Sequence, residues 1–299
     1  MYKKISVVLL SIAMSLECTI SSAFACDLPK FNGYNGEEVH LFILWENALK
    51  NKVNCKKIER DIEQNFEILG KYKITWSKDK IENNLRRLYN QGENFAKQQA
   101  IQKGCNKFLL IIVNVKNPKY EKRNLLDGSE EIVCTNVFDK KYWYRKTYLK
   151  GAYPTIHSTV TSYEADHDLT LLLGQSAEDF KATHNGIWNG KTIELNQDLF
   201  GASGWSNLND LFYALNYCSN YVVLKNCNEK SILSGFTNID LLCDSLRETA
   251  YAANAVKFVG KNHLSYYKLT LHTTKVVGFL FQRPLHCYKS FSFTRSPQA

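Results

Sequence analysis

The sequence lacks the short motifs that most directly identify a metal-binding or nucleic-acid-binding protein. It contains no C-x-x-C pair, which argues against a structural zinc site built from closely spaced cysteines. It has no dense block of lysine and arginine, no zinc-finger spacing and no aromatic RNA-binding motif, so nucleic acid is a weak candidate as a partner. Internal repeats and low-complexity tracts are also absent.

What remains is the composition of a globular protein. The 299 residues suffice for two ordinary domains, with 44% hydrophobic and 22% charged side chains. The formal net charge is +9. A basic excess suits phosphate-bearing partners or anionic surfaces, and it is equally typical of a solubility charge spread over many lysines.

The N-terminus has the order of a secretory signal. Lys3 and Lys4 precede an apolar stretch at 5–14, and Ala23-Phe24-Ala25 forms a small-x-small cleavage site before Cys26. The apolar stretch is too short to cross a bilayer as a mature helix. We therefore expect residues 1–25 to be a signal peptide and the protein to be exported, either periplasmic or secreted. A mobile or buried N-terminal helix is the alternative.

The cysteines beyond this signal are even in number, which permits disulfides in an exported protein without assigning their pairing. They are Cys26, Cys55, Cys105, Cys134, Cys218, Cys227, Cys243 and Cys287. Cys218 and Cys243 lie on apolar faces, which is also consistent with plain buried thiols.

Hydrophobic periodicity predicts alternating strands and helices in the first half of the chain. Strands are expected at 39–44, 72–76, 108–113 and around position 157; helices are expected at 55–69, after Ser77 and from Ser162 to Leu173, and a loop at 117–131. Ser162 is a plausible N-cap and Gly174 a stop signal. This order is compatible with an α+β domain of the ferredoxin-like, split βαβ type over residues 27–175.

A second, smaller α/β unit is expected at 206–282, after a glycine-containing linker at 176–205. Its predicted helices are 207–217, capped by Ser206, and 245–254; its predicted strands are 221–224, 239–243, 264–272 and 275–281. Residues 283–299 have little periodicity and are expected to be a tail.

One segment carries a recognisable chemical pattern. His157 is followed by Thr159 two residues later and by Asp168 eleven residues later, on the predicted helix. This spacing resembles the signature of nucleoside diphosphate kinases, with Asp168 in place of the usual glutamate. A neutral imidazole can attack phosphorus with one nitrogen when a hydrogen bond at the other nitrogen fixes the tautomer. The resemblance implies that His157 carries the phosphoryl group, that Asp168 orients it and that Thr159 touches the phosphate.

The resemblance extends over roughly half of the chain. It implies that Tyr89 and Arg145 bind the phosphates of a nucleotide, and that the cofactor is Mg²⁺ with ATP or another nucleoside triphosphate. Trp45 is a departure, because the family has a phosphate-binding lysine there. Loss of a lysine removes positive charge from a site where transition-state charge spreads.

The same segment also allows a metal site, because His157, Asp166, His167 and Asp168 are all metal-ligand types. His167 and Asp168 are adjacent on a predicted helix and are expected to point to different faces. A dedicated metal cage is therefore the less favoured interpretation.

The second unit more faintly resembles the nucleotidyltransferase fold, whose paired carboxylates hold Mg²⁺ ions. The resemblance makes Asp240 a weak metal-ligand candidate and Lys225 a nucleotide-binding candidate. Asn238 stands where the first carboxylate is expected, and Leu280 stands near the place of a third. Nucleotidyl transfer is therefore expected to be lost if the fold is right.

Phosphoryl transfer through a phosphohistidine at His157 is the leading functional hypothesis. The first alternative is a catalytically degenerate exported protein that binds nucleotide, glycan or protein, which the departures at Trp45, Asn238 and Leu280 motivate. The second alternative is a residual nucleotidyltransferase in surface-polysaccharide metabolism that uses Asp240.

Overall fold

The computed structural model describes residues 36–282, except for 105, 126–127, 151–154, 185–187, 225–229, 231, 233–238, 260–264 and 272–274. Several of the sequence-based expectations therefore lie outside the described residues. They are the signal peptide at 1–25, the tail at 283–299, the site candidate Lys225, the departure at Asn238, and the cysteines at 26, 105, 227 and 287.

A five-stranded mixed sheet forms the centre of the N-terminal half. Its strand order is β6-β1-β3-β2-β7, where β1 is Glu38–Trp45, β2 is Glu67–Thr75, β3 is Lys107–Val115, β6 is Ile156–Ser158 and β7 is Thr192–Asn196. The first four are joined by antiparallel pairing, whereas β7 pairs parallel to β2. Every residue of β1 is buried, as expected for a central strand covered on both faces.

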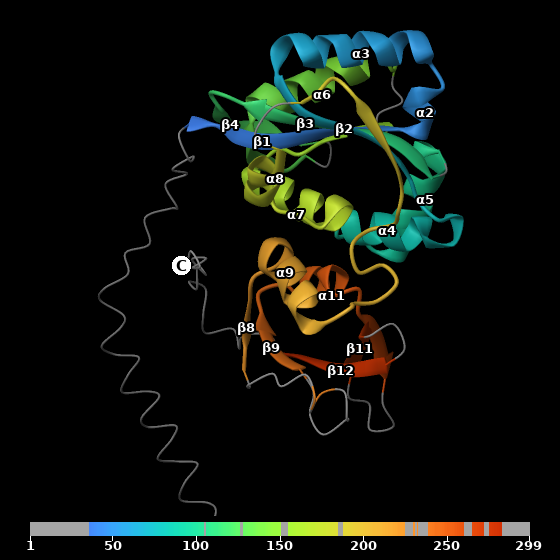
Figure 1. Ribbon diagram of the computed structural model, residues 1–299, viewed down its shortest axis with the longest axis vertical. Coiled ribbons are helices and arrows are strands. Elements are labelled where there is room, and N and C mark those ends of the chain that lie inside the picture. The colour runs from blue at the N-terminus through green and yellow to red at the C-terminus, as the bar shows by residue number, and fades with distance from the viewer. Residues whose placement is uncertain are drawn as a thin grey trace, which may run out of the picture. The chain divides into compact units, whose positions relative to one another are not determined.

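Helices cover both faces of this sheet (Figure 1). On one face lie α3 (Lys52–Asn65) and α6 (Thr135–Thr147), which pack Ile58, Ile62 and Tyr144 against apolar side chains of the sheet. The other face carries α4 (Ile81–Leu88), α5 (Glu93–Lys103), α7 (Ser162–Leu173) and α8 (Ala177–His184). The short α2 (Glu46–Leu49) directly follows β1, and a 3₁₀ turn at Lys78–Lys80 precedes α4.

The start and end of α7 are fixed by local hydrogen bonds. The N-cap is Thr161, one residue before the expected Ser162, and its Oγ1 accepts from the backbone N–H of Glu164 at 3.1 Å. Glu164 in turn accepts from the N–H of Val160 at 2.6 Å, which completes a reciprocal cap. Gly174 ends the helix at φ +69°, a conformation that favours glycine. These contacts fix the path from β6 into the helix that carries Asp168.

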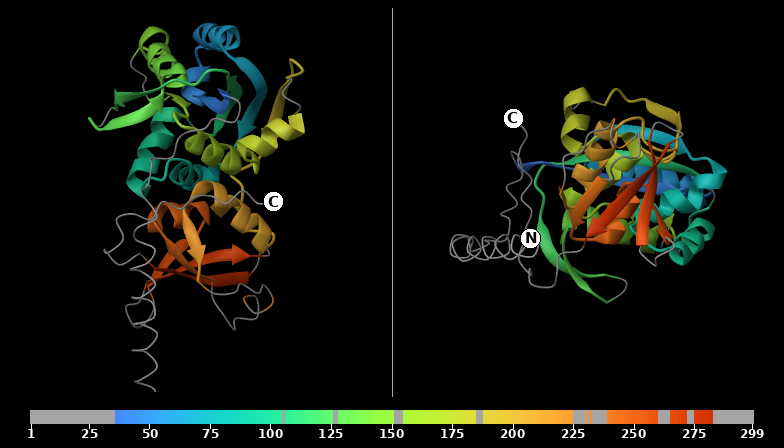
Figure 2. Two further views of the ribbon diagram at one scale, coloured as in Figure 1. Left: turned by 90° about the vertical axis from the view of Figure 1, so that its left-hand side faces the viewer. Right: turned by 90° about the horizontal axis from the view of Figure 1, so that it is seen from below.

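Two segments contain strands that the sequence did not suggest. Residues 117–131 were expected to be a loop, but they contribute to a hairpin of β4 (Tyr120–Asn124) and β5 (Glu130–Cys134), visible in green in Figure 2. The range 176–205, expected as a linker, contains α8 and β7. The residues of both strands are mostly exposed. β4 has no apolar alternation, whereas β7 has a short one, with Ile193 and Leu195 between polar residues.

A second five-stranded sheet has the order β10-β11-β12-β9-β8. Its strands are β8 (Tyr221–Val223), β9 (Ile239–Cys243), β10 (Val256–Val259), β11 (Ser265–Leu271) and β12 (Lys275–Gln282), with parallel pairing only between β9 and β12. The helices are α9 (Leu208–Cys218), capped by Asn207 rather than Ser206, and α11 (Leu246–Ala252). The α+β class is confirmed. No helix within the described residues has the length and apolar character needed to cross a membrane.

Arg87 links α4 to the segment around α11. Its guanidinium is completely buried and donates to the carbonyl oxygens of Tyr251 at 2.8 Å, Phe200 at 2.7 Å and Ala252 at 3.1 Å. Burial lowers the pKa of Arg87 to about 10, so the group remains charged at neutral pH. A buried cation that satisfies three carbonyls fixes the position of α4, which bears Tyr89 at its C-terminal end.

Candidate functional site

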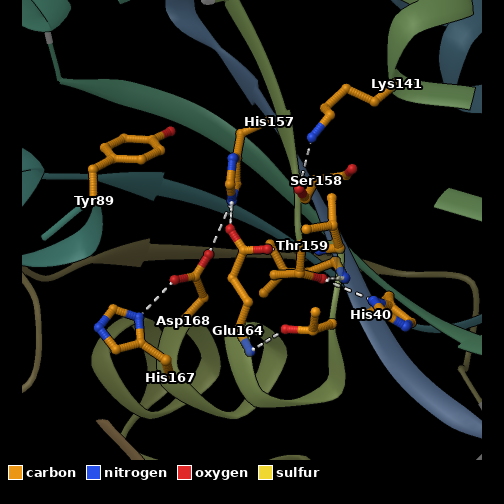
Figure 3. A network of polar contacts seen from close by, with 12 residues as sticks. His40, Tyr89, Lys141, His157, Ser158, Thr159, Glu164, His167 and Asp168 are labelled. Atoms are coloured by element: carbon orange, nitrogen blue, oxygen red, sulfur yellow. Dashed lines mark hydrogen bonds and ion pairs between the residues drawn. The ribbon is translucent and has the colours of Figure 1, made fainter. Parts of the chain in front are cut away.

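His157 and Asp168, the pair with the predicted spacing, are in direct contact. His157 lies in β6 and Asp168 in the second turn of α7, and Nε2 of the imidazole is 3.1 Å from Oδ2 of the carboxylate (Figure 3). Within the described residues, Nδ1 of His157 has no hydrogen-bond partner. The carboxylate thus holds one ring nitrogen, and the other is left as the candidate nucleophile.

Asp168 also binds a second histidine. Its Oδ1 lies 2.9 Å from Nδ1 of His167, so the two adjacent side chains meet instead of pointing to different faces as expected. Burial alone would raise the pKa of the Asp168 carboxyl, but hydrogen bonds from His157 and His167 outweigh it and the pKa is lowered. Asp168 is therefore a carboxylate at neutral pH, which is the form that can orient His157.

Glu164 is a second acid beside the imidazole. Its Oε1 is 3.7 Å from Nε2 of His157, and its side chain is 33% exposed, against 2% for Asp168. One ligand atom each from His157, Glu164 and Asp168 falls within 4.8 Å of the others, a spacing that a metal ion could bridge. Because Glu164 is the accessible member of the three, it is the one that an incoming cation would meet first.

Tyr89 packs its ring against His157. The two rings are nearly perpendicular, with centroids 5.2 Å apart, and the indole N–H of Trp45 donates to the Tyr89 hydroxyl at 3.2 Å. Burial, followed by the negative charge of Asp168, raises the pKa of Tyr89 well above its usual value. The phenol is therefore neutral, and it lies beside the histidine; its expected contact with a nucleotide phosphate remains a prediction.

Three buried cations surround this group, and two of them were not singled out from the sequence. Nζ of Lys103 lies 5.0 Å from the centre of the Trp45 ring and 4.5 Å from that of Tyr89. Burial, and then repulsion by Arg145 and Lys141, lowers the pKa of Lys103 well below its usual value. Burial likewise lowers the pKa of Lys141 to about 8. Cations that repel one another inside a protein mark a position where an anion is stabilised.

Arg145 and Lys141 flank strand β6 from helix α6. Arg145 donates through Nε and Nη2 to the carbonyl oxygen of Ile156 at 3.2 and 2.7 Å, and Nζ of Lys141 lies 3.4 Å from that of Ser158. Both cations therefore bind the backbone on either side of His157. Their four-residue spacing on one helix face was a signal that could have been used in the sequence. Lys103 gave no such signal, because a lysine in the last turn of a helix is ordinary.

Thr159 lies away from the imidazole of His157. Its Oγ1 is 3.1 Å from Nδ1 of His40 and accepts a hydrogen bond from the backbone N–H of Leu41 at 3.1 Å. Figure 3 shows this contact on the far side of β6 from Asp168. Thr159 is completely buried, so the structure does not bring its hydroxyl to the place where the motif would have it touch a phosphate.

Asp240 is placed in β9 of the second sheet, where it is buried and its carbonyl accepts from the N–H of Leu224 at 2.9 Å. Leu280 of β12 is its direct neighbour in the parallel register. The neighbouring strand therefore offers an apolar residue and no second carboxylate at this position.

A cavity of about 230 Å³ lies elsewhere, between α4 and α5, and is lined by Asp79, Glu82, Asn83, Arg86, Glu93 and Ala96. It does not include His157, whose side chain is 11% exposed. The acidic lining of this cavity suits neither a phosphate nor a nucleotide.

The His157 group is thus a histidine with one nitrogen fixed by a carboxylate, a neutral phenol against its ring and three cations nearby. Comparison of the chain with protein-family models, with curated proteins and with solved structures gave no match.

Proposed function

We propose that this protein is a nucleotide-binding phosphotransferase in which His157 carries the phosphoryl group. The observation that carries the proposal is the 3.1 Å contact between Nε2 of His157 and Oδ2 of Asp168. It keeps the proton on Nε2 and leaves a lone pair on Nδ1 for attack on phosphorus.

The chemical step is a displacement at the terminal phosphorus of a nucleoside triphosphate. The Nδ1 lone pair forms the N–P bond while the bond between phosphorus and the bridging oxygen breaks, and the nucleoside diphosphate leaves with that electron pair. The Nε2 proton stays hydrogen-bonded to Asp168, whose charge stabilises the positive ring. Transfer to a second nucleoside diphosphate reverses these steps and restores the free imidazole.

Lys103 is the candidate for the positive charge that the motif assigns to position 45. Its pKa is lowered by burial and by neighbouring cations, and a phosphate bound beside it would favour the charged form. Trp45 has no charge, but Nζ of Lys103 lies over its ring and over that of Tyr89, which itself contacts His157. Lys141 and Arg145 flank the strand that carries the histidine. Three cations near the reacting atom would stabilise the charge on the transferred phosphoryl oxygens.

The donor set suits a magnesium ion that arrives with the nucleotide. Mg²⁺ prefers carboxylate and phosphate oxygens, and Glu164 offers a partly exposed carboxylate beside His157. When bound, the ion would neutralise phosphate charge. Glu164 would hold it, while Asp168 remains engaged by its two histidines.

The strand order also supports the resemblance. Strands β6-β1-β3-β2 have antiparallel neighbours and a helix in each crossover, an order that is compatible with a ferredoxin-like split βαβ sheet. We propose that this is the fold of the N-terminal half and that the second sheet is a nucleotidyltransferase-like unit without catalytic carboxylates. Fold alone carries no activity, so the function rests on the histidine.

Burial of His157 favours one competing function, a degenerate protein that binds a nucleotide without turnover. With 11% of the side chain exposed and Tyr89 against the ring, a donor has limited access to Nδ1. A degenerate protein would be labelled by neither donor. A reactive but buried His157 would be labelled slowly by ATP and faster by a compact donor such as phosphoramidate.

Incubation of the purified chain with radiolabelled ATP and Mg²⁺, and separately with phosphoramidate, tests the proposal. We expect acid-labile, base-stable phosphate that His157→Ala abolishes. His184→Asn is the matched control. That ring stacks on Phe180 with centroids 4.0 Å apart, and its Nε2 contacts the hydroxyl of Tyr72 and not Asp168. Nucleotide binding by calorimetry without any label from either donor would establish the degenerate function instead.

A further inference from the structure

A second group of chemically reactive side chains lies on the face of β1 opposite to the face that α7, the helix of Asp168, covers. Glu38 and His40 are two residues apart in β1, so both side chains point to the same face of the strand. Cys134, at the N-cap of α6, completes the group. All three are buried, and one ligand atom from each lies within 4.8 Å of the other two.

His40 and Glu38 are in hydrogen-bond contact, at a separation that two ligands of one metal ion would also have. Nε2 of His40 lies 3.3 Å from Oε2 of Glu38. A direct charged hydrogen bond between such atoms is about 2.7–2.9 Å. In a tetrahedral zinc site with bond lengths of about 2.0–2.1 Å, ligand nitrogen and oxygen atoms are separated by roughly 3.3 Å.

The outer contacts are those that orient metal ligands. Nδ1 of His40 is 3.1 Å from Oγ1 of Thr159, whose hydroxyl also accepts from the N–H of Leu41 and can accept from the imidazole as well. Thr159 can thus hold Nδ1, while Nε2, which is hydrogen-bonded to Oε2 of Glu38, would give up its proton on binding a metal. The hydroxyl of Tyr120 donates to Oε2 of Glu38 at 2.6 Å. Ligating histidines and carboxylates are commonly held in this way by a second shell.

Cys134 supplies the soft ligand. It lies at the N-cap of α6, Thr135–Thr147, and its Sγ contacts Oδ1 of Asn136 at 3.7 Å. Its complete burial excludes a large substrate, so a role as an exposed nucleophile does not fit. A carboxylate and a thiolate together carry the charge that a divalent cation neutralises, and an imidazole adds a neutral ligand.

We propose that Glu38, His40 and Cys134 bind one Zn²⁺ ion, with water in the fourth position. Thiolate, imidazole and carboxylate are the ligand types that zinc takes, and the ion displaces the thiol proton to solvent. The site joins β1 to the start of α6, and it is independent of the function proposed for His157. The absence of a C-x-x-C pair is no obstacle, because the fold and not the local sequence assembles these ligands.

Titration of the metal-depleted full chain with Co²⁺ tests the proposal, because cobalt reports thiolate ligation through a near-ultraviolet charge-transfer band. We expect one equivalent to bind, with the band present and displaced by Zn²⁺. Cys134→Ser should abolish the band and weaken binding by more than the 10–100-fold typical of losing an outer contact. The matched control is Cys55→Ser, another buried thiol, 3.6 Å from Glu59, which should retain both.

The ligand set of the wild-type protein can be measured even if Cys134→Ser does not fold. X-ray absorption of the zinc-loaded chain should show one sulfur at about 2.3 Å and the remaining nitrogen or oxygen ligands at about 2.0–2.1 Å. His157→Ala should bind the metal normally. No stoichiometric uptake, two or more sulfur ligands, undiminished binding by folded Cys134→Ser, or loss of binding in His157→Ala would each overturn the assignment.

Discussion

Oδ2 of Asp168 lies 3.1 Å from Nε2 of His157. The contact joins a strand to the following helix across the Thr161 cap, and both side chains are largely buried. Because Asp168 simultaneously binds His167, the carboxylate has little freedom to turn away. The imidazole of His157 is therefore held in one tautomer and one orientation before any substrate arrives.

Asp168→Asn should separate orientation from folding. The amide has only one oxygen and can replace only one of the two hydrogen bonds that the carboxylate accepts, so we expect phosphohistidine formation to fall by roughly 10²-fold or more. Loss of charge-assisted hydrogen bonds should also lower the free energy of unfolding by about 1–3 kcal/mol. Single-turnover labelling and urea unfolding measure the two effects. Asp166→Asn is the neighbouring control, because the carboxylate of Asp166 accepts from the N–H of Ala177 and not from a histidine. Equal labelling of the wild type and Asp168→Asn would contradict the role of Asp168 in orienting His157.

Lys103→Met should weaken binding of ADP. If Lys103 supplies the positive charge missing at Trp45, removing it should reduce affinity by on the order of tenfold or more, as for a charged hydrogen bond of about 1.5–3 kcal/mol. Isothermal titration calorimetry at fixed ionic strength gives the ratio. Lys97→Met, on the same helix but paired with Glu93 at its exposed face, should bind as the wild type does. Identical affinities of both variants for ADP would show that Lys103 does not contribute to nucleotide binding.

Lys141 makes stability depend on pH in a defined direction. Its folded-state pKa is about 8, because of burial and repulsion by Arg145 against the attraction of Glu164 and Glu131. The unfolded chain therefore binds more protons between about pH 8 and 10.5, and stability rises with pH across that window. Below pH 8 the full cost of the buried charge is present.

Lys141→Met should consequently stabilise the protein at pH 7 by on the order of 1–3 kcal/mol. The increase in the free energy of unfolding between pH 8 and 10 should be smaller than in the wild type. Urea unfolding at a series of pH values tests both parts. A variant that is less stable at pH 7, and whose free energy of unfolding still rises with pH above pH 8 as in the wild type, would contradict this. It would show that contacts in the folded state offset the cost of burying Lys141.

Arg87→Met should be strongly destabilising. It leaves the carbonyls of Tyr251, Phe200 and Ala252 without their donor in a buried environment, and we expect a loss of about 3 kcal/mol or more. Arg86→Met, which loses one bond to Asn83 and a stacking contact with Tyr251, should cost less than about 1 kcal/mol. Chemical denaturation of the two variants side by side gives the comparison, and similar losses would contradict it.

The sequence predicted several local elements of the fold. Apolar runs located β1, β3 and β9, and the spacing from His157 to Asp168 placed both on one strand-to-helix connection, because a short strand and two helical turns have fixed dimensions. The caps were displaced by one residue, to Thr161 and Asn207, where several hydroxyl and amide side chains compete for the same backbone donors.

The non-local parts could not be predicted in this way. Lys103 approaches Trp45 only because α5 ends beside β1, and Cys134 approaches His40 only because α6 begins over the same strand. The hairpin was missed because β4 is polar and exposed and carries no hydrophobic period. Strand β7 does alternate at Ile193 and Leu195, but the alternation spans only five residues at the edge of the sheet. Thr159 shows the converse: the motif places its hydroxyl at a phosphate, whereas the fold turns it to His40.

The most direct test is the position of phosphorus on the imidazole of His157, measured by phosphorus-31 NMR on chain labelled with ATP or phosphoramidate. Because Asp168 holds Nε2, we predict a phosphoryl group on Nδ1, with no signal in His157→Ala. Phosphorus attached to Nε2, or no phosphohistidine from either donor in a folded protein, would contradict a phosphoryl carrier oriented by Asp168.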